Sequence, residues 1–147
     1  MRISIMTSLG AIGSFITAAL GGWDYALQML LIIMAFDYAS GWVVAAIFRK
    51  SRKTKSGAVN STVGFIGIAK KVMLLVLVAA AHQIDLGIGT GFIRNAVIFA
   101  FAANELVSLM ENAGLMGIPW PPMLKRALDI LQDKGELTNE NDPTAKP

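Results

Sequence analysis

The chain has 147 residues, of which 54% are hydrophobic and 16% are charged, and its formal net charge is +3. Because the apolar residues fall in long runs, the composition is typical of an integral membrane protein and argues against a soluble domain with a large core. Seven of the 13 basic residues lie between Arg49 and Lys71, in a region without Asp or Glu, so the charge indicates membrane topology and not nucleic-acid binding.

The first apolar stretch, Ile3–Leu20, contains 18 residues and no charge. This length is marginal for a membrane span. Small residues recur every four positions at Gly10, Ser14 and Ala18, and such ridges let membrane helices approach closely. We expect a first span whose N-terminus lies in the cytoplasm; a cleaved signal peptide and an interfacial helix are the alternatives.

The second apolar stretch, Tyr25–Phe48, is long enough at 24 residues to cross a hydrocarbon core about 30 Å thick. Aromatic residues near its ends fit an interfacial belt. Five basic residues follow it directly, and basic residues close to a span stay on the cytoplasmic side. These predicted topology-determining residues are Arg49, Lys50, Arg52, Lys53 and Lys55.

One carboxylate, Asp37, lies near the middle of this second span. A charge at mid-bilayer costs about 2.5–3.5 kcal/mol on insertion scales, so it needs a partner, a wet cavity or a proton. Asp37 is therefore a candidate functional residue. Gly41, one turn further on, is a predicted helix-packing position, as are Gly10, Ser14 and Ala18.

The segment Ser56–Ala69 is rich in glycine and serine, and we expect it to lie along the inner membrane surface. It forms part of a predicted basic cytoplasmic loop, residues 49–70. Lys70 and Lys71 then mark the cytoplasmic end of a third span, residues 71–88, which a tight glycine-rich turn ends on the outer side.

The last predicted span, residues 92–112, carries a polar stripe. Arg94 lies at its outer end, where it is expected to snorkel to the interface or to pair with Asp85 across the turn. The polar side chains further along fall on one helical face, which must look towards protein or water and not towards lipid. The stripe consists of Arg94, Glu105, Ser108 and Asn112, with Asn104 and Glu111 on its flank.

Asp37 and Glu105 are predicted to lie at similar depths, because the two spans run in the same direction and the acids occur 12 and 13 residues into them. Three interpretations are open: protonated acids that hydrogen-bond between helices, a hydrated face that is hidden between subunits and later lines a lesion, and a proton relay. The relay is disfavoured because the pattern predicts no lysine or second histidine as a mid-span partner. The predicted oligomer or lesion-lining face comprises Asp37, Asn104, Glu105, Ser108 and Asn112.

Residues 113–134 are expected to form an interfacial turn and a short amphipathic helix. Its apolar stripe comprises Leu124, Ala127, Leu128 and Leu131. The polar tail, residues 135–147, is expected to be disordered in the cytoplasm. The predicted fold class is therefore all-α integral membrane. It is a bundle of four transmembrane helices, or three if the first stretch does not cross, followed by the short C-terminal amphipathic helix.

The order and spacing of several motifs resemble those of the phage lysis and toxin-secretion holin family, over roughly Asp24 to Leu131. The chain departs from the family pattern in its apolar N-terminal stretch, because family members are often drawn with three spans. The motifs that carry the resemblance are Asp37-Tyr-Ala-Ser40-Gly41, the basic loop with Ser56, Gly64 and Lys70-Lys71, Asn104-Glu105-x-x-Ser108-x-x-Glu111-Asn112-x-Gly114, and Pro119 with Pro122.

The resemblance implies a small protein made by a phage or prophage. Such a protein is a multi-pass resident of the host's cytoplasmic (inner) membrane. The basic residues Lys125 and Arg126, which follow the last span, place the C-terminus in the cytoplasm. A protein of this kind forms homo-oligomers within the lipid bilayer and opens lesions that release an endolysin, or in some relatives a toxin. The endolysin is a functional partner without stable contact, and neither a cofactor nor nucleic acid is implied.

Two other functions fit the same pattern: a small ion or solute channel subunit, and an anti-holin of the same fold. An enzyme is not expected, because the sequence offers no nucleophile–base pair. A metal site is not expected either, because the chain has no cysteine and its single histidine, His82, is predicted to hydrogen-bond to a neighbouring helix or to headgroup water. No catalytic, cofactor-binding or metal-binding residue is therefore predicted.

Overall fold

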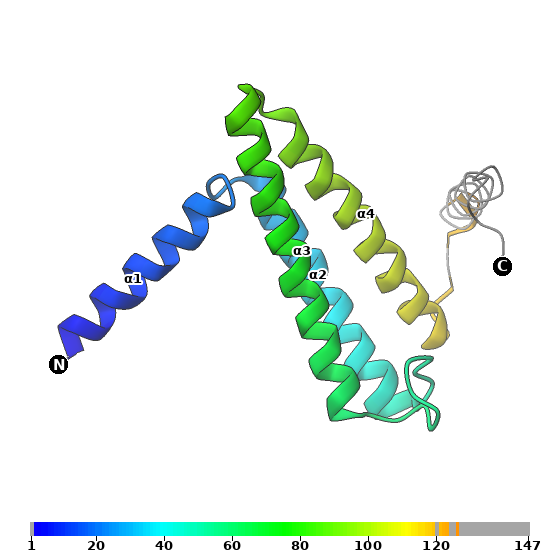
Figure 1. Cartoon of the computed structure of the whole chain (residues 1–147). Coiled ribbons are helices and arrows are strands. Elements are labelled where there is room, and N and C mark those ends of the chain that lie inside the picture. The colour runs from blue at the N-terminus through cyan, green and yellow to red at the C-terminus, as the bar shows by residue number, and fades with distance from the viewer. Residues whose placement is uncertain (1, 120, 124–125, 127–147) are drawn as a thin grey trace, which may run out of the picture.

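A computed structural model of the chain describes residues 2–119, 121–123 and 126 (Figure 1). Within these residues all the regular structure is helical, and the turns between helices are short except for one loop after the second helix. The elements are α1 (Arg2–Ala19), α2 (Tyr25–Val43), the π-helical turn η1 (Val44–Phe48), α3 (Ser61–Ile88) and α4 (Phe92–Leu115).

Three of the helical segments are long and apolar enough to cross a membrane. They are Tyr25–Phe48 with 24 residues, Ser61–Ile88 with 28 and Phe92–Leu115 with 24. At about 1.5 Å per residue, 24 residues reach about 36 Å, which exceeds a hydrocarbon core of about 30 Å. The described apolar part of α1, Met6–Ala19, is shorter, so three span-length helices are found and the expected fourth is not confirmed.

Helix α4 holds the bundle together by packing against both α2 and α3, which contact each other far less. The apolar core lies towards the α3–α4 turn, where Leu27, Leu30, Val78 and Ile98 are fully buried. The outer faces carry many exposed large apolar side chains, as a lipid-facing surface requires. The half of the bundle towards the loop after α2 is packed differently, because polar side chains replace the apolar core there.

The start of α3 corrects the predicted loop, residues 49–70. Asn60 caps the helix, since its Oδ1 accepts hydrogen bonds from the backbone N–H groups of Thr62 at 2.9 Å and Val63 at 3.2 Å. Residues 61–69 are therefore the first turns of a continuous helix. The start at Ser61 places Lys71 ten residues into α3, whereas the prediction placed it at the start of the third span.

Helix α1 leaves the bundle at an angle (Figure 1). Large apolar side chains on it are exposed, such as Phe15 at 75%. The turn that joins it to α2 depends on Gly21 and Gly22, whose φ angles are +85° and +97°. At Gly21 a Cβ would also lie 2.6 Å from Arg94 Nε and 2.8 Å from His82 Nδ1. Glycine is therefore required here for two reasons, the positive φ angle and the lack of space for a side chain. His82 itself is half-buried.

The predicted C-terminal elements fall mostly outside the described residues. Helix α4 continues to Leu115, three residues beyond the predicted end of the last span. The predicted amphipathic stripe and the tail, residues 135–147, lie outside the part of the chain that the structure describes, as does Trp120.

We predict that Gly21→Ala detaches α1 from the bundle and lowers the free energy of unfolding by more than about 2 kcal/mol. The added methyl cannot be accommodated, because hydrogen bonds hold Arg94 against it. Gly22→Ala is the matched control: its φ is equally positive, but nothing lies within 4 Å of the added Cβ. The control isolates backbone strain of about 1–2 kcal/mol. Unfolding by SDS in mild detergent micelles, followed by circular dichroism, measures both, and equal losses would contradict the prediction.

Candidate functional site

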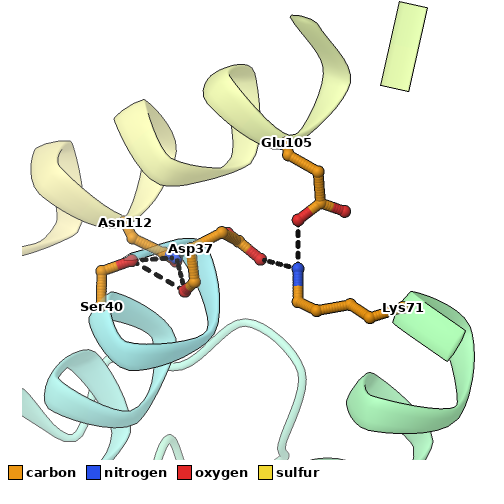
Figure 2. A network of polar contacts seen from close by, with 5 residues as sticks. All are labelled: Asp37, Ser40, Lys71, Glu105 and Asn112. Carbon is orange, nitrogen blue, oxygen red and sulfur yellow. Dashed lines mark hydrogen bonds and ion pairs between the residues drawn. The ribbon is translucent and has the colours of Figure 1, made fainter. Parts of the chain in front are cut away.

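A charged cluster joins the three span-length helices through a single lysine (Figure 2). Lys71 Nζ, from α3, lies 2.8 Å from Asp37 Oδ2, on α2, and also donates to Glu105 Oε2, on α4. Asp37 is 5% exposed and Glu105 8%, so both carboxylates are buried. Each helix thus contributes one charged side chain to a contact that exists only when all three pack together.

An amide and a hydroxyl complete the hydrogen bonding of Asp37 (Figure 2). Asn112 Nδ2 donates to Asp37 Oδ1 at 3.2 Å and to Ser40 Oγ at 2.9 Å. Ser40 Oγ donates to the backbone carbonyl of Asp37 at 2.8 Å. Both carboxylate oxygens of Asp37 are therefore engaged, one by Lys71 and one by Asn112. We call Asp37, Ser40, Lys71, Glu105 and Asn112 the central cluster.

The central cluster contains two acids and one base, so it carries one excess negative charge unless an acid retains its proton. No other basic side chain in the described residues pairs with Asp37 or Glu105. Burying charges is costly, and the attraction between them offsets the cost only when the geometry and the remaining hydrogen bonds are good. Removal of Lys71 would leave both buried carboxylates without a counter-charge and is expected to be strongly destabilising.

A pocket of about 360 Å³ lies beside the central cluster, between α2, η1, α3 and α4 and the loop after η1. Asp37, Lys71 and Glu105 are among its lining residues, as are Asn104 and Ser108. A space of this size that polar side chains partly line is large enough to hold water. The cluster is therefore buried from lipid but borders a cavity that reaches the loop.

A second polar group fixes the opposite end of the bundle. Arg94, which is 6% exposed, donates from Nη1 to Asp24 Oδ2 at 2.6 Å and from Nε to the carbonyl of Leu20 at 2.5 Å. It also donates from Nη2 to the carbonyl of Gly22 at 3.3 Å. Arg94 therefore ties the end of α1 and the start of α2 to α4. The guanidinium beside Asp24 holds the pKa of that carboxyl below its ordinary value.

The structure does not contain the ion pair between Arg94 and Asp85 that the sequence suggested, because Arg94 pairs with Asp24. Asp85 accepts instead from the backbone N–H groups of Ile93 at 3.0 Å and Arg94 at 2.8 Å, and from Thr90 Oγ1 at 2.5 Å. It thus caps the first turn of α4, whose N–H groups have no partner within the helix. The guanidinium is left free to bind Asp24.

The structure brings together three of the predicted polar-face residues, Asp37, Glu105 and Asn112, in the central cluster. Ser108 is half-buried and Asn104 is exposed, and both line the pocket. Glu111, on the flank of the face, is exposed and lines it too.

Of the other predicted residues, Lys71 belongs to the cluster and Gly41 lies beside it, whereas the rest lie on the loop or on exposed helix faces. Arg49, Lys50, Arg52, Lys53 and Lys55 are exposed in the loop, and Lys70 is exposed on α3. Gly10, Ser14 and Ala18 are exposed on α1. At Gly41 a Cβ would lie 3.7 Å from Asn112 Nδ2, so this glycine lies where α2 approaches α4 closely.

The prediction that no lysine pairs with the acids was wrong, because Lys71 is that partner. The sequence held a signal for it: Asn60 followed by serine and threonine is a helix N-cap pattern, which starts α3 early enough to carry Lys71 inward. Ser40 and Asp24 were also missed as partners. No group of three or more His, Asp or Glu side chains that could hold a metal occurs in the described part of the chain.

Comparison with known proteins identifies a family. Residues 14–133 match the model of a family described as the bacteriophage holin family. No solved structure matches the chain.

Several curated proteins are similar over most of their length. An uncharacterized protein of Halalkalibacterium halodurans is 37% identical over 138 residues, which cover 90% of this chain and 96% of the relative. An uncharacterized protein of Listeria monocytogenes is 36% identical over 144 residues, 97% of each chain. A probable holin of Bacillus phage phi105 is 23% identical over 120 residues, 81% of this chain and 83% of the phage protein.

We predict that Lys71→Met destabilises the bundle by about 3–5 kcal/mol, because two buried carboxylates lose their counter-charge. Lys70→Met is the matched control, since Lys70 is the exposed neighbour and makes no ion pair within the described residues. It is expected to change stability by less than about 0.5 kcal/mol. SDS-induced unfolding in mild detergent measures both, and similar midpoints for the two variants would refute a structural role for the lysine.

We also predict that acid loosens the attachment of α1. Because the pKa of Asp24 is lowered in the folded chain, its pair with Arg94 stabilises the fold above the ordinary pKa, and this stabilisation is lost as the pH falls through the lowered value. Spin labels on cysteines at Phe15 and Leu106, both exposed in a chain that has no native cysteine, report the α1–α4 distance.

The distance should lengthen or broaden at low pH in the otherwise unchanged chain. In Asp24→Asn it should already be broad at neutral pH and should not respond to acid. The same acid response in both chains would assign the effect to another group.

Proposed function

The chain belongs to the bacteriophage holin family, and on this basis we propose that it is a holin. It accumulates in the cytoplasmic membrane of a bacterial host, oligomerises there and opens lesions. The lesions release an endolysin, or a toxin, and the host cell lyses. The observation that carries the proposal is the buried central cluster, which gives a membrane-length bundle a charged interior.

The central cluster supports a protomer with two arrangements. In the closed arrangement Asp37 and Glu105 are satisfied by Lys71, and lipid contacts only the apolar outer faces. If the three helices separate in lipid, the ion pairs break and the charged groups are exposed to hydrocarbon, which costs free energy. They can separate cheaply only where water replaces the lost partners. Opening is therefore coupled to the formation of a water-filled lesion lined by Asp37, Asn104, Glu105, Ser108 and Asn112.

Oligomerisation supplies the concentration dependence that such a protein needs. The small residues of α1, Gly10, Ser14 and Ala18, are exposed and are available to a second copy. Contacts between membrane helices contribute about 0.6–2 kcal/mol for each interhelical hydrogen bond, and many weak contacts in a raft add up. Assembly then becomes steep in the amount of protein, so the dispersed chain is harmless and the clustered chain is lethal.

The proposed orientation follows the basic residues. The loop after η1 carries Arg49, Lys50, Arg52, Lys53 and Lys55, and it is placed in the cytoplasm by the tendency of basic residues to remain inside. The central cluster and its pocket then lie nearer the cytoplasmic face, and the α3–α4 turn faces outward. The C-terminus is cytoplasmic, and the N-terminus is cytoplasmic if α1 crosses the membrane.

Controlled expression in a bacterium tests the proposal, with and without a cytoplasmic endolysin and with a folded cytoplasmic reporter protein. A holin produces an abrupt loss of viability, reporter escape in both cultures, and lysis only with endolysin. Leakage of ions without escape of the reporter would show that the protein is a channel and not a holin. No effect at high membrane abundance would replace it with an anti-holin.

Amide variants test the role of the central cluster in timing. Asp37→Asn or Glu105→Gln each leaves one acid paired with Lys71, so the cluster becomes neutral, the closed arrangement gains stability and lysis is delayed. The double variant leaves a half-buried lysine without a counter-charge, so its delay should be smaller than that of either single variant. Glu111→Gln is the control, because Glu111 is an exposed acid on the same helix as Glu105, and it should change the timing least. Unchanged timing in both single variants at equal membrane abundance would contradict this role.

A further inference from the structure

The pocket beside the central cluster has a second side that the proposed lesion does not use. Residues of the loop after η1 and of the first turns of α3 form part of its wall. Arg52 and Lys53 line it from the loop and Lys70 lines it from α3, and all three side chains are exposed. The pocket therefore opens to the surface at the loop end of the bundle.

Some of the charged side chains around the pocket form ion pairs and others do not. Four basic and three acidic side chains line it: Arg52, Lys53, Lys70 and Lys71 against Asp37, Glu105 and Glu111. Lys71 is taken up by two of the acids. Arg52, Lys53 and Lys70 form no ion pair with any described residue, and among the lining acids only Glu111 is similarly unpaired. The pocket mouth thus presents surplus positive charge from two separate segments of the chain.

Apolar groups lie close to these cations. Val44, which is 1% exposed, the half-buried Val63 and the ring of Trp42 also line the pocket. A ligand that fits must therefore carry a negative charge and an apolar part. The volume of about 360 Å³ falls in the range of about 300–1,000 Å³ that is usual for small-ligand sites.

We propose that this pocket binds the headgroup of an anionic membrane phospholipid. Arg52, Lys53 and Lys70 hold the phosphate, and the apolar lining receives the glycerol and the first carbons of the acyl chains. The position supports a lipid over a free phosphate, because the pocket lies at one end of span-length helices, where headgroups are found, and because its lining is partly apolar. Basic pockets between membrane helices are known to bind such headgroups.

Binding there ties the loop to α3, next to the ion pairs of Lys71. The inference does not depend on holin function, because it rests on the cavity and its charges. The proposed site also differs from a general attraction of the basic loop to anionic lipid. Three of the cations line one pocket, whereas the loop residues Lys50 and Lys55 do not.

The test uses the full chain, purified in an uncharged detergent. Replacing Trp23 and Trp120 by Phe leaves Trp42, in the pocket, as the single fluorescent tryptophan. Short-chain phosphatidylglycerol, short-chain phosphatidylcholine and glycerol 3-phosphate are titrated separately, and native mass spectrometry counts the bound lipids. Saturable binding of one phosphatidylglycerol per chain is expected, with far weaker binding of the other two.

Two double variants remove the same charge from the same loop. Arg52→Gln with Lys53→Gln should weaken phosphatidylglycerol binding by roughly tenfold or more, since each basic residue near a headgroup contributes appreciably. Lys50→Gln with Lys55→Gln should change it by less than about twofold, because neither residue lines the pocket. Glu111→Gln should strengthen binding, because it removes the unpaired acid from the lining.

Equal losses in the two double variants would overturn the site in favour of diffuse attraction to the loop. Equal binding of phosphatidylcholine would overturn the selectivity for an anionic lipid. If glycerol 3-phosphate bound as tightly as the lipid, the pocket would be a site for a free anion and the lipid proposal would be overturned. The helical content and melting of each variant by circular dichroism verify that the chain is folded.

Discussion

The ion pairs of Lys71 are the contact on which the rest of the bundle depends. In lipid the hydrophobic effect does not hold helices together, because the surroundings are as apolar as their side chains. A lysine between two carboxylates from different helices supplies an attraction that lipid cannot replace. It also dictates composition, since α2, α3 and α4 must each turn one polar face inward while their outer faces stay apolar.

The two ends of the bundle are consequently built in different ways. Towards the α3–α4 turn, Leu27, Leu30, Val78 and Ile98 form a dry core. Arg94 closes this end by binding Asp24 and the carbonyls before it. Towards the loop, the core is replaced by the central cluster and a pocket that polar and apolar side chains both line. The dry end is suited to remain packed, whereas the polar end borders space where water can enter. A change in helix packing would therefore begin at the loop end.

This asymmetry suits the holin function that we propose for the chain. A protein that is harmless when dispersed and opens lesions when clustered must conceal polar surface from lipid and later expose it to water. The central cluster is concealed in the single chain, and the energetic cost of exposing it depends on whether water is present. A phospholipid in the neighbouring pocket would add a further contact between the loop and α3, so membrane composition would influence the same equilibrium.

The sequence by itself determined the helical class, the bounds of the segment Tyr25–Phe48, and the polar face of α4 with Glu105 and Asn112. These features depend on local composition and helical period, and a membrane forces each helix to satisfy its own backbone. Only the tertiary structure decided which charges meet. Lys71 is 34 residues from both Asp37 and Glu105, and its inward position follows from the start of α3 at Ser61. Arg94 had two acids within reach, and it binds Asp24 because Asp85 is engaged by the backbone N–H groups of α4.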